Sequence, residues 1–220
     1  MKAREKLRAV HSLLLKEYGH HQWEAHRDPL SELVRTILSQ NTSDVNSNRA
    51  FAGLRERFPS WEQVRQADVT AIEEAIRPGG LARIKAPRIK SALQAIVEER
   101  GELDLEFLRQ LELDEARAWL QSLAGVGPKT AACVLLFSLG RPVLPVDTHV
   151  LRVSRRVGLI ESGTSMEKAH EVLGEMSPEG AVYDFHVNMV SHGRQVCHPR
   201  RPRCEACVLA PHCGYLHRGR

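Results

Sequence analysis

Apolar residues at helical spacing are the feature that most limits what this chain can fold into. Leucine, isoleucine and valine recur three or four positions apart, which predicts amphipathic helices. The first two runs comprise Leu7, Val10, Leu13 and Leu14, then Leu30, Leu33, Val34, Ile37 and Leu38. An alternating strand pattern is absent, and the two prolines of stretch 142–146 predict an extended connector. We therefore expect an all-α fold.

Residues that start and stop helices agree with this expectation. Asp28 before Pro29 is typical of a helix start, and Ser60 three residues before Gln63 fits a capping box. Other signals are two candidate N-caps and three glycines that follow periodic stretches. They are Asp68 and Asp114, then Gly101, Gly140 and Gly158.

The bulk composition is ordinary for a folded, water-exposed protein. Of the 220 residues, 42% are hydrophobic and 26% are charged. Stretch 1–15 lacks the apolar core of a signal peptide, and no apolar run approaches the ~20 residues that span a bilayer. We expect a cytoplasmic protein that does not associate with membranes.

Basic charge is concentrated near the C-terminal end. The net charge is only +4, but residues 191–220 contain six arginines and a single acidic residue, Glu205. Clustered arginine suits a phosphate-binding surface, and it equally suits a solvated tail. Charge alone leaves both interpretations open.

A glycine-rich turn lies between two expected helices, at about 115–123 and 128–139. The string from Leu123 to Thr130 reads Leu-Ala-Gly-Val-Gly-Pro-Lys-Thr. Gly125 and Gly127 permit unusual backbone angles, and Pro128 suits the first turn of a helix. The exposed amides of such a turn can bind a phosphate without reading bases. The alternative is an ordinary hairpin whose glycines only form the turn.

Lys129 and Asp147 are the residues best suited to chemistry. A neutral lysine amine can attack an electrophilic carbon and form a Schiff base. Asp147 lies in the string Val-Asp-Thr-His, where a carboxylate can cap a helix and also stabilise a developing positive charge. For either residue alone the simpler interpretation is structural: a solvent-exposed ion pair for the lysine and a helix cap for the aspartate.

Four cysteines are clustered in the sequence. Cys197, Cys204, Cys207 and Cys213 have the spacing C-x6-C-x2-C-x5-C. Because nothing marks the chain as secreted, a metal site is favoured over disulfides. Four thiolates fit either structural zinc or an iron–sulfur cluster, and spacing alone leaves both open. Cys133, inside an apolar helix, is expected to be a core residue.

The combined motifs resemble the endonuclease III family of helix–hairpin–helix DNA glycosylases. They are the hairpin string with its lysine, the Val-Asp-Thr-His string eighteen residues later, and the cysteine spacing. The resemblance implies two helical lobes with a DNA groove between them: a six-helix barrel with the hairpin, residues 30–141, and an iron–sulfur lobe, residues 1–29 with 142–220. It also implies that Lys129 is the nucleophile, that Asp147 is the catalytic carboxylate, and that the cysteines hold a [4Fe–4S] cluster.

The resemblance also indicates which residues contact DNA. On the hairpin these are Gly125, Val126, Gly127 and Thr130, and beside the cluster they are Arg200, Arg201 and Arg203. Two loops resemble those that probe damaged bases, one with Gln40, Asn41 and Asp44 and the other with Leu81. The first loop could instead only cap a helix, and Leu81 could fold back onto the core. A basic surface is expected after Leu81, from Arg83, Lys85, Arg88 and Lys90.

The implied function is base excision repair. A bifunctional glycosylase and abasic-site lyase would remove oxidised pyrimidines from duplex DNA through a lysine Schiff base and β-elimination, acting as a nucleoid-associated monomer. Lys129 favours this branch, because the adenine-specific mismatch glycosylases of the superfamily lack a lysine there. The alternatives are a mismatch-directed thymine or uracil glycosylase, a non-catalytic DNA-binding protein and a zinc-stabilised nucleic-acid module.

Three residues depart from the family pattern. Ala124 stands where the family usually has proline, and Asn41 where it often has glutamine. Pro128 stands where a basic residue is frequent, which removes a possible phosphate contact from the hairpin.

Overall fold

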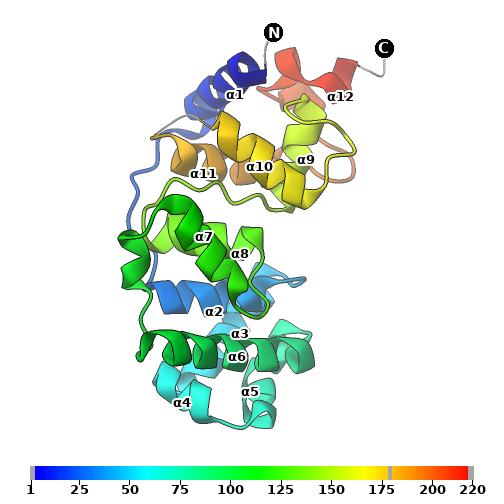
Figure 1. The fold of residues 1–220 in the computed structure, drawn as a ribbon. Helices are drawn as coiled ribbons and strands as arrows, with labels where there is room; N and C mark the ends of the chain where they lie inside the picture. Colours follow the sequence, from blue (N-terminus) through cyan, green and yellow to red (C-terminus); the bar gives the residue numbers. More distant parts are fainter. Residues whose placement is uncertain (1–2, 178–179, 218–220) are drawn as a thin grey trace. The chain divides into compact units, whose positions relative to one another are not determined.

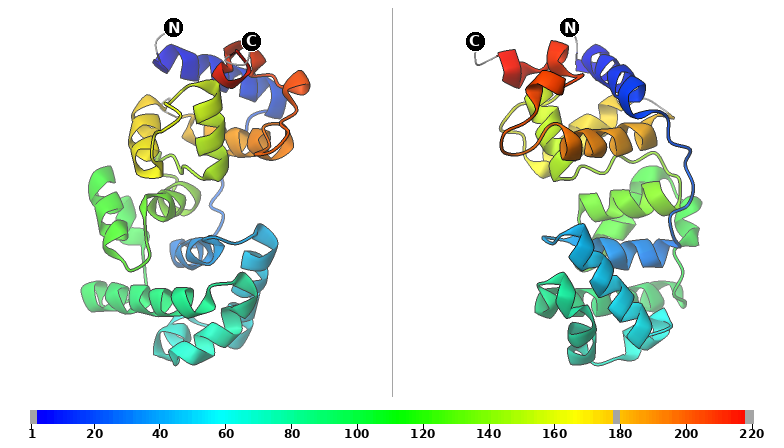
Figure 2. Two further views of the ribbon diagram at one scale, coloured as in Figure 1. Left: turned by 90° about the vertical axis from the view of Figure 1, so that its right-hand side faces the viewer. Right: turned by 180° about the vertical axis from the view of Figure 1, so that it is seen from behind.

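The computed structural model describes residues 3–177 and 180–217. Within them every regular element is a helix (Figures 1 and 2), so the all-α prediction is confirmed. The α-helices are α1 (Ala3–Tyr18), α2 (Pro29–Ser39), α3 (Asp44–Arg57), α4 (Trp61–Gln66), α5 (Val69–Ile76), α6 (Ala82–Arg100), α7 (Leu113–Ser122), α8 (Pro128–Cys133), α9 (Thr148–Val157), α10 (Met166–Met176), α11 (Val182–Gln195) and α12 (Gly214–His217). Short 3-10 helices are η1 (Arg77–Gly79), η2 (Glu106–Arg109), η4 (Cys204–Ala206) and η5 (Ala210–His212), and η3 (Val134–Ser138) is a π-helix. None of the described helices is long and apolar enough to cross a membrane.

The chain divides into two compact units. One comprises residues 24–141, and the other joins residues 1–23 to 142–220. The boundary expected from the sequence, at residue 30, differs because residues before α2 already pack within the first unit. The His26 amide donates to the Phe137 carbonyl at 2.9 Å, and the two rings stack with their centroids 4.8 Å apart.

Helix α2 lies at the centre of the core of unit 24–141. It packs against α3, α6, α8 and η3. Its apolar side chains are at most 6% exposed, and they are the run predicted from the sequence: Leu30, Leu33, Val34, Ile37 and Leu38. Because α2 is buried, its C-terminal end gives a fixed starting point to the loop that follows Ser39.

Side-chain caps begin several helices where the sequence predicts them. Asp28 Oδ1 accepts a hydrogen bond from the Ser31 amide at 2.9 Å, and the capping box at Ser60 is present. The prediction for Asp114 is wrong. Helix α7 begins before it, because Glu112 takes the N-cap position and its amide donates to the Glu115 carboxylate at 3.3 Å. The predicted stop glycines Gly101 and Gly158 end α6 and α9 in left-handed conformation, and Gly140 follows Leu139, the C-cap of the π-helix. Asp68 holds the N-cap position of α5 without a side-chain bond.

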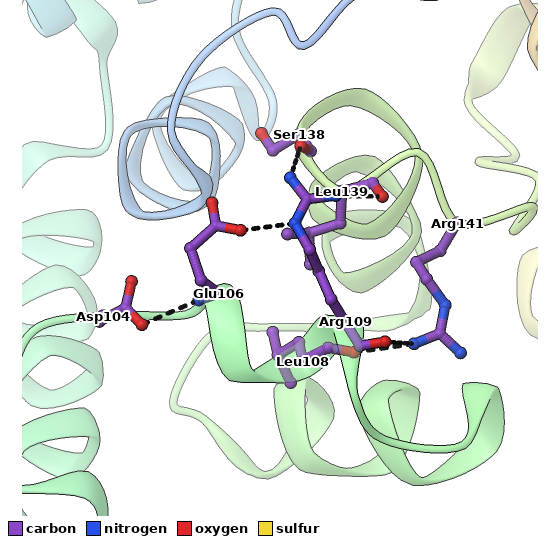
Figure 3. Close-up of polar contacts among 7 residues, drawn as sticks. All are labelled: Asp104, Glu106, Leu108, Arg109, Ser138, Leu139 and Arg141. Atoms are coloured by element: carbon purple, nitrogen blue, oxygen red, sulfur yellow. Dashed lines mark hydrogen bonds and ion pairs between the residues drawn. The ribbon is translucent and has the colours of Figure 1, made fainter.

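Two arginines tie the end of the hairpin's outgoing helix to the loop before α7 (Figure 3). Arg109 donates to the carbonyls of Ser138 and Leu139 at 3.0 and 2.7 Å. Arg141 donates in the opposite direction, to three carbonyls within residues 108–111 at 2.8 to 3.2 Å. Carbonyls at helix ends lack partners within the helix, and these side chains supply them.

The second unit is organised by α11, which packs against α1 and α9. Asn188 of α11 is completely buried and donates through Nδ2 to the Gly19 carbonyl at 3.0 Å. Asp184, one turn earlier, accepts from the His21 amide at 2.6 Å. These bonds hold residues 19–21 on α11, so the start of the chain belongs to this unit.

Candidate functional site

The predicted hairpin is formed by α7, a short turn and α8. Val126 anchors the turn, since its side chain is only 6% exposed and its amide donates to the Leu123 carbonyl at 3.1 Å. Gly127 is the N-cap of α8 and Pro128 its first residue. The outgoing helix was expected to run to Leu139. It does continue to Ser138, but its second half is a π-helix.

Gly125 is required at the tip of this turn for two reasons. Its φ of +78° lies in the left-handed region that favours glycine. A Cβ at this position would also lie 2.6 Å from Cδ of Arg88, which is a collision. Arg88 was expected on a basic surface, and no local pattern in the sequence predicts this packing. The exposed Arg88 guanidinium therefore lies close to the hairpin, which has Pro128 where a basic residue is frequent in the family.

Lys129 is the second residue of α8 and is half-buried. The next residue, Thr130, is 2% exposed, so its hydroxyl faces the interior. The amides at the first turn of a helix have no partner within the helix. Backbone amides of Gly127, Lys129 and Thr130 can therefore donate hydrogen bonds around the half-buried amine of the Lys129 side chain.

Gln40 connects the first probing loop to the hairpin. Its Nε2 donates to the Gly125 carbonyl at 2.9 Å and lies 3.4 Å from Thr130 Oγ1. Arg88 Nη1 donates to Gln40 Oε1 at 3.4 Å. Gln40 was expected to contact DNA, but in this structure its amide makes its bonds to the hairpin. No sequence signal links residues 40, 88 and 125.

Asn41 and Leu81 are the exposed tips of the two predicted probing loops. Each has a φ of 52°, which is uncommon for a residue other than glycine. Ser43 is the N-cap of α3, so Asn41 lies outside the helix, and Asp44 is an exposed first residue of α3. Leu81 is 48% exposed and therefore does not fold back onto the core.

The basic surface predicted after Leu81 is wrong for Lys85. Arg83 and Arg88 are exposed, but Lys85 is only 1% exposed. Its ammonium donates to two backbone carbonyls, and burial lowers its pKa. Lys90 is half-buried and donates to the Ala67 carbonyl at 2.7 Å.

Asp147 caps α9 in the second unit, so the capping role expected for it is present. Its Oδ1 accepts from the amides of His149 and Val150, both at 2.8 Å. Both bonds use the same oxygen, so the half-buried side chain can direct Oδ2 to another partner. Lys129 belongs to the other compact unit.

All four clustered cysteines line one small cavity. Burial raises the pKa of the Cys207 thiol to about 11 and also raises that of Cys204. A cationic centre bound by these half-buried sulfurs would favour their thiolate form. Among the described residues, no three His, Cys, Asp or Glu side chains converge closely enough to share one metal ion. The four thiols of this cavity are soft donors of the kind that bind soft metals.

Two arginines of α9, missed by the sequence reasoning, hold the cysteine loop. Arg156 donates to Cys197 Sγ at 3.3 Å and to the His198 carbonyl at 2.6 Å. Arg152 donates to the Cys197 carbonyl at 2.9 Å. The helix that Asp147 begins is thus bound directly to the cysteine cavity.

The predicted DNA-contacting side chains nearby are all exposed: Arg200, Arg201 and Arg203. Cys133 is buried in unit 24–141, as expected.

Comparison with known proteins identifies the family. Residues 34–179 match the family described as HhH-GPD superfamily base excision DNA repair protein. The chain is 35% identical over 191 residues to endonuclease III of Thermotoga maritima. This alignment covers 87% of this chain and 85% of that protein. It is 42% identical over 182 residues to an Arabidopsis thaliana protein provisionally described as a DNA glycosylase. That match covers 83% of this chain and 60% of the relative's length.

A solved structure extends the match to the whole fold. A non-covalent complex of endonuclease III with DNA superposes with a TM-score of 0.85 at 28% identity, covering 100% of this chain and 99% of that one. Fold and sequence together define an enzyme of the DNA glycosylase class. The chain belongs to the HhH-GPD superfamily of base excision DNA repair proteins, among its endonuclease III-like members. The predicted family and enzyme class are confirmed.

Proposed function

We propose that this enzyme is a bifunctional glycosylase and abasic-site lyase that removes oxidised pyrimidines from duplex DNA. The observation that carries the proposal is the position of Lys129, a half-buried amine in the first turn of the helix that leaves the hairpin. A lysine in that place can form a covalent intermediate with a sugar.

The chemistry assigns one role to each residue. The neutral Lys129 amine attacks C1′, and the bond from C1′ to the base breaks with its electron pair leaving on the base. Asp147 stabilises the positive charge that develops on the sugar and accepts a proton from the attacking amine. Ring opening gives a Schiff base. Loss of a C2′ proton then expels the 3′ phosphate, and water hydrolyses the imine to regenerate Lys129.

DNA binding is assigned to elements in both units. Backbone amides of the hairpin (Gly125, Gly127 and Thr130) would bind a phosphate, while Val126 anchors the turn because its amide donates to the Leu123 carbonyl. Arg200, Arg201 and Arg203 would contact the DNA backbone elsewhere. Asn41 and Leu81 would fill the space left by the extruded nucleotide, and Gln40 and Asp44, in the same loop as Asn41, would contact bases. This function requires access to the genome and is compatible with a monomer.

The substrate is tested with four duplexes that differ at a single position. They carry thymine glycol, an abasic site, thymine opposite guanine, or uracil opposite guanine. We expect base release and strand cleavage on thymine glycol and cleavage at the abasic site. Release of mismatched thymine or uracil with no action on thymine glycol would favour a mismatch glycosylase. Binding without release on every duplex would leave a DNA-binding protein.

We also propose that Cys197, Cys204, Cys207 and Cys213 hold a [4Fe–4S] cluster. The donor set and the shared cavity support this, since four thiolates are its usual ligands. When bound, the cluster would have a structural role, holding the loop that α9 contacts through Arg152 and Arg156.

The cluster gives a direct spectroscopic prediction. Purified protein is expected to be yellow-brown, with absorption near ~400 nm and about four iron atoms per chain. Cys207→Ser should lose this absorption and lower the melting temperature, whereas Cys133→Ser, a matched change of a buried cysteine outside the cavity, should retain the spectrum. A colourless protein containing zinc would contradict the assignment.

A further inference from the structure

Lys85 is a charged residue in the interior of unit 24–141. Its side chain is 1% exposed, and its ammonium donates to the carbonyl of Leu38 at 2.7 Å and to that of Gly79 at 2.9 Å. Within the described residues no carboxylate pairs with it. Burying a cation is unfavourable unless its surroundings compensate the charge. The two carbonyls must therefore supply that compensation.

Both acceptors lie at helix ends. Leu38 is in the last turn of α2, and Gly79 is the last residue of η1. The Leu38 carbonyl has no partner within α2 and lies at the negative end of its dipole, and the Gly79 carbonyl ends the single turn of η1. One ammonium therefore caps two helices at once. Hydrogen bonds from a charged donor are stronger than neutral ones, so the two ends are held firmly.

The two capped ends lead directly into the two probing loops. Asn41 follows Leu38 by three residues, and Leu81 follows Gly79 by two. Only three non-glycine residues in the described part of the chain have a positive φ, and Asn41 and Leu81 are two of them. Such backbone conformations persist only where the surrounding structure holds them. Lys85 contacts a carbonyl three residues before Asn41 and another two residues before Leu81.

We propose that Lys85 is a positioning residue for lesion recognition, which holds both loop bases so that Asn41 and Leu81 enter the DNA together. The inference rests on the proposed function of these two residues. Lys85 is buried and cannot contact DNA itself. It acts on the opening of the duplex, and not on the lyase chemistry at a sugar that is already exposed.

The test compares Lys85→Met with Lys90→Met. Methionine has a similar shape without charge, so the substitution removes the donor of the Leu38 and Gly79 carbonyls and changes the packing little. Lys90 is the matched control because it lies on the same helix, α6, and also donates to a carbonyl, that of Ala67 at 2.7 Å. Ala67 follows α4 and precedes no probing loop.

Three quantities are measured for each variant. The first is the single-turnover rate of base release from a thymine glycol duplex. The second is the lyase rate on an abasic site in single-stranded DNA, where no duplex must open. The third is the fluorescence of 2-aminopurine placed beside the lesion, which rises when neighbouring bases unstack.

For Lys85→Met we expect base release from duplex to fall about tenfold or more, as for the loss of a hydrogen bond to a charged group. The fluorescence rise should be lost and the single-strand lyase rate should stay within about twofold of wild type. A purely structural role would lower both rates together. Lys85→Arg, which keeps the donors and the charge, should recover part of the duplex rate. If Lys85→Met melts below the assay temperature, Lys85→Gln replaces it, because its amide can still donate to one carbonyl.

Leu81→Ala separates this inference from the proposed function. A double variant Lys85→Met/Leu81→Ala that is no slower than Leu81→Ala alone would support action through the loop. If Leu81→Ala is impaired but Lys85→Met behaves like Lys90→Met, the positioning role is overturned and the proposed function stands. If Leu81→Ala and Asn41→Ala both release the base at the wild-type rate, the proposed role of the loops fails, and the role of Lys85 with it.

Discussion

Lys129→Ala is expected to abolish the covalent protein–DNA complex that borohydride traps on an abasic-site duplex. Borohydride reduces a Schiff base to a stable amine, so only the residue that attacks the sugar becomes linked to DNA. The rate of strand cleavage should fall on the order of 10³-fold or more, as when a nucleophile is removed from other enzymes. Alanine is a better helix former than lysine, so α8 should remain folded.

Lys168→Ala is the control for this experiment. Lys168 lies on α10, is exposed, and pairs with Glu171 at 2.6 Å, so its loss removes one amine without touching the hairpin. The control should form the trapped complex at the wild-type level. A complex that persists in Lys129→Ala would show that another amine is the nucleophile. A wild-type enzyme that releases the base without a trapped complex would be monofunctional.

Asp147→Asn is expected to slow base release by about 10²-fold or more while leaving the melting temperature almost unchanged. Asparagine is as good an N-cap as aspartate, and its Oδ1 can accept from the amides of His149 and Val150 as the carboxylate does. The substitution therefore removes the charge but keeps the cap. Single-turnover base release and thermal melting measure the two effects separately.

Asp147→Ala completes the comparison. It removes the cap as well, which typically costs about 1 kcal/mol, so both the rate and the stability should fall. The alternative result is that Asp147→Asn releases the base at nearly the wild-type rate, whereas Asp147→Ala is both slower and less stable. That result would assign Asp147 a capping role only.

The parts of the fold that depend on local sequence could be predicted. Helix spacing gave the buried run of α2, and the Gly125–Pro128 string gave the hairpin. Asp28 and Ser60 began their helices as expected. Each of these features depends on residues within about one helical turn, which is the range over which propensity and capping act.

The errors and omissions concern contacts between distant residues. Lys85 was placed on the surface because lysine is usually exposed. Its acceptor at Leu38 is 47 positions away, so no local pattern could reveal it. The bond from Gln40 to Gly125 spans 85 positions, and that from Arg156 to the His198 carbonyl spans 42. Whether a polar side chain faces DNA or the backbone of its own protein is decided by such contacts.

The reciprocal arginines of Figure 3 have a consequence for how unit 24–141 opens. Arg109 holds carbonyls at residues 138 and 139, while Arg141 holds carbonyls at residues 108–111. Neither segment can leave the other without breaking both sets of bonds. In native-state hydrogen exchange they would therefore behave as a single cooperative unit. The far end of the helix that carries Lys129 would lose protection only when the loop before α7 does.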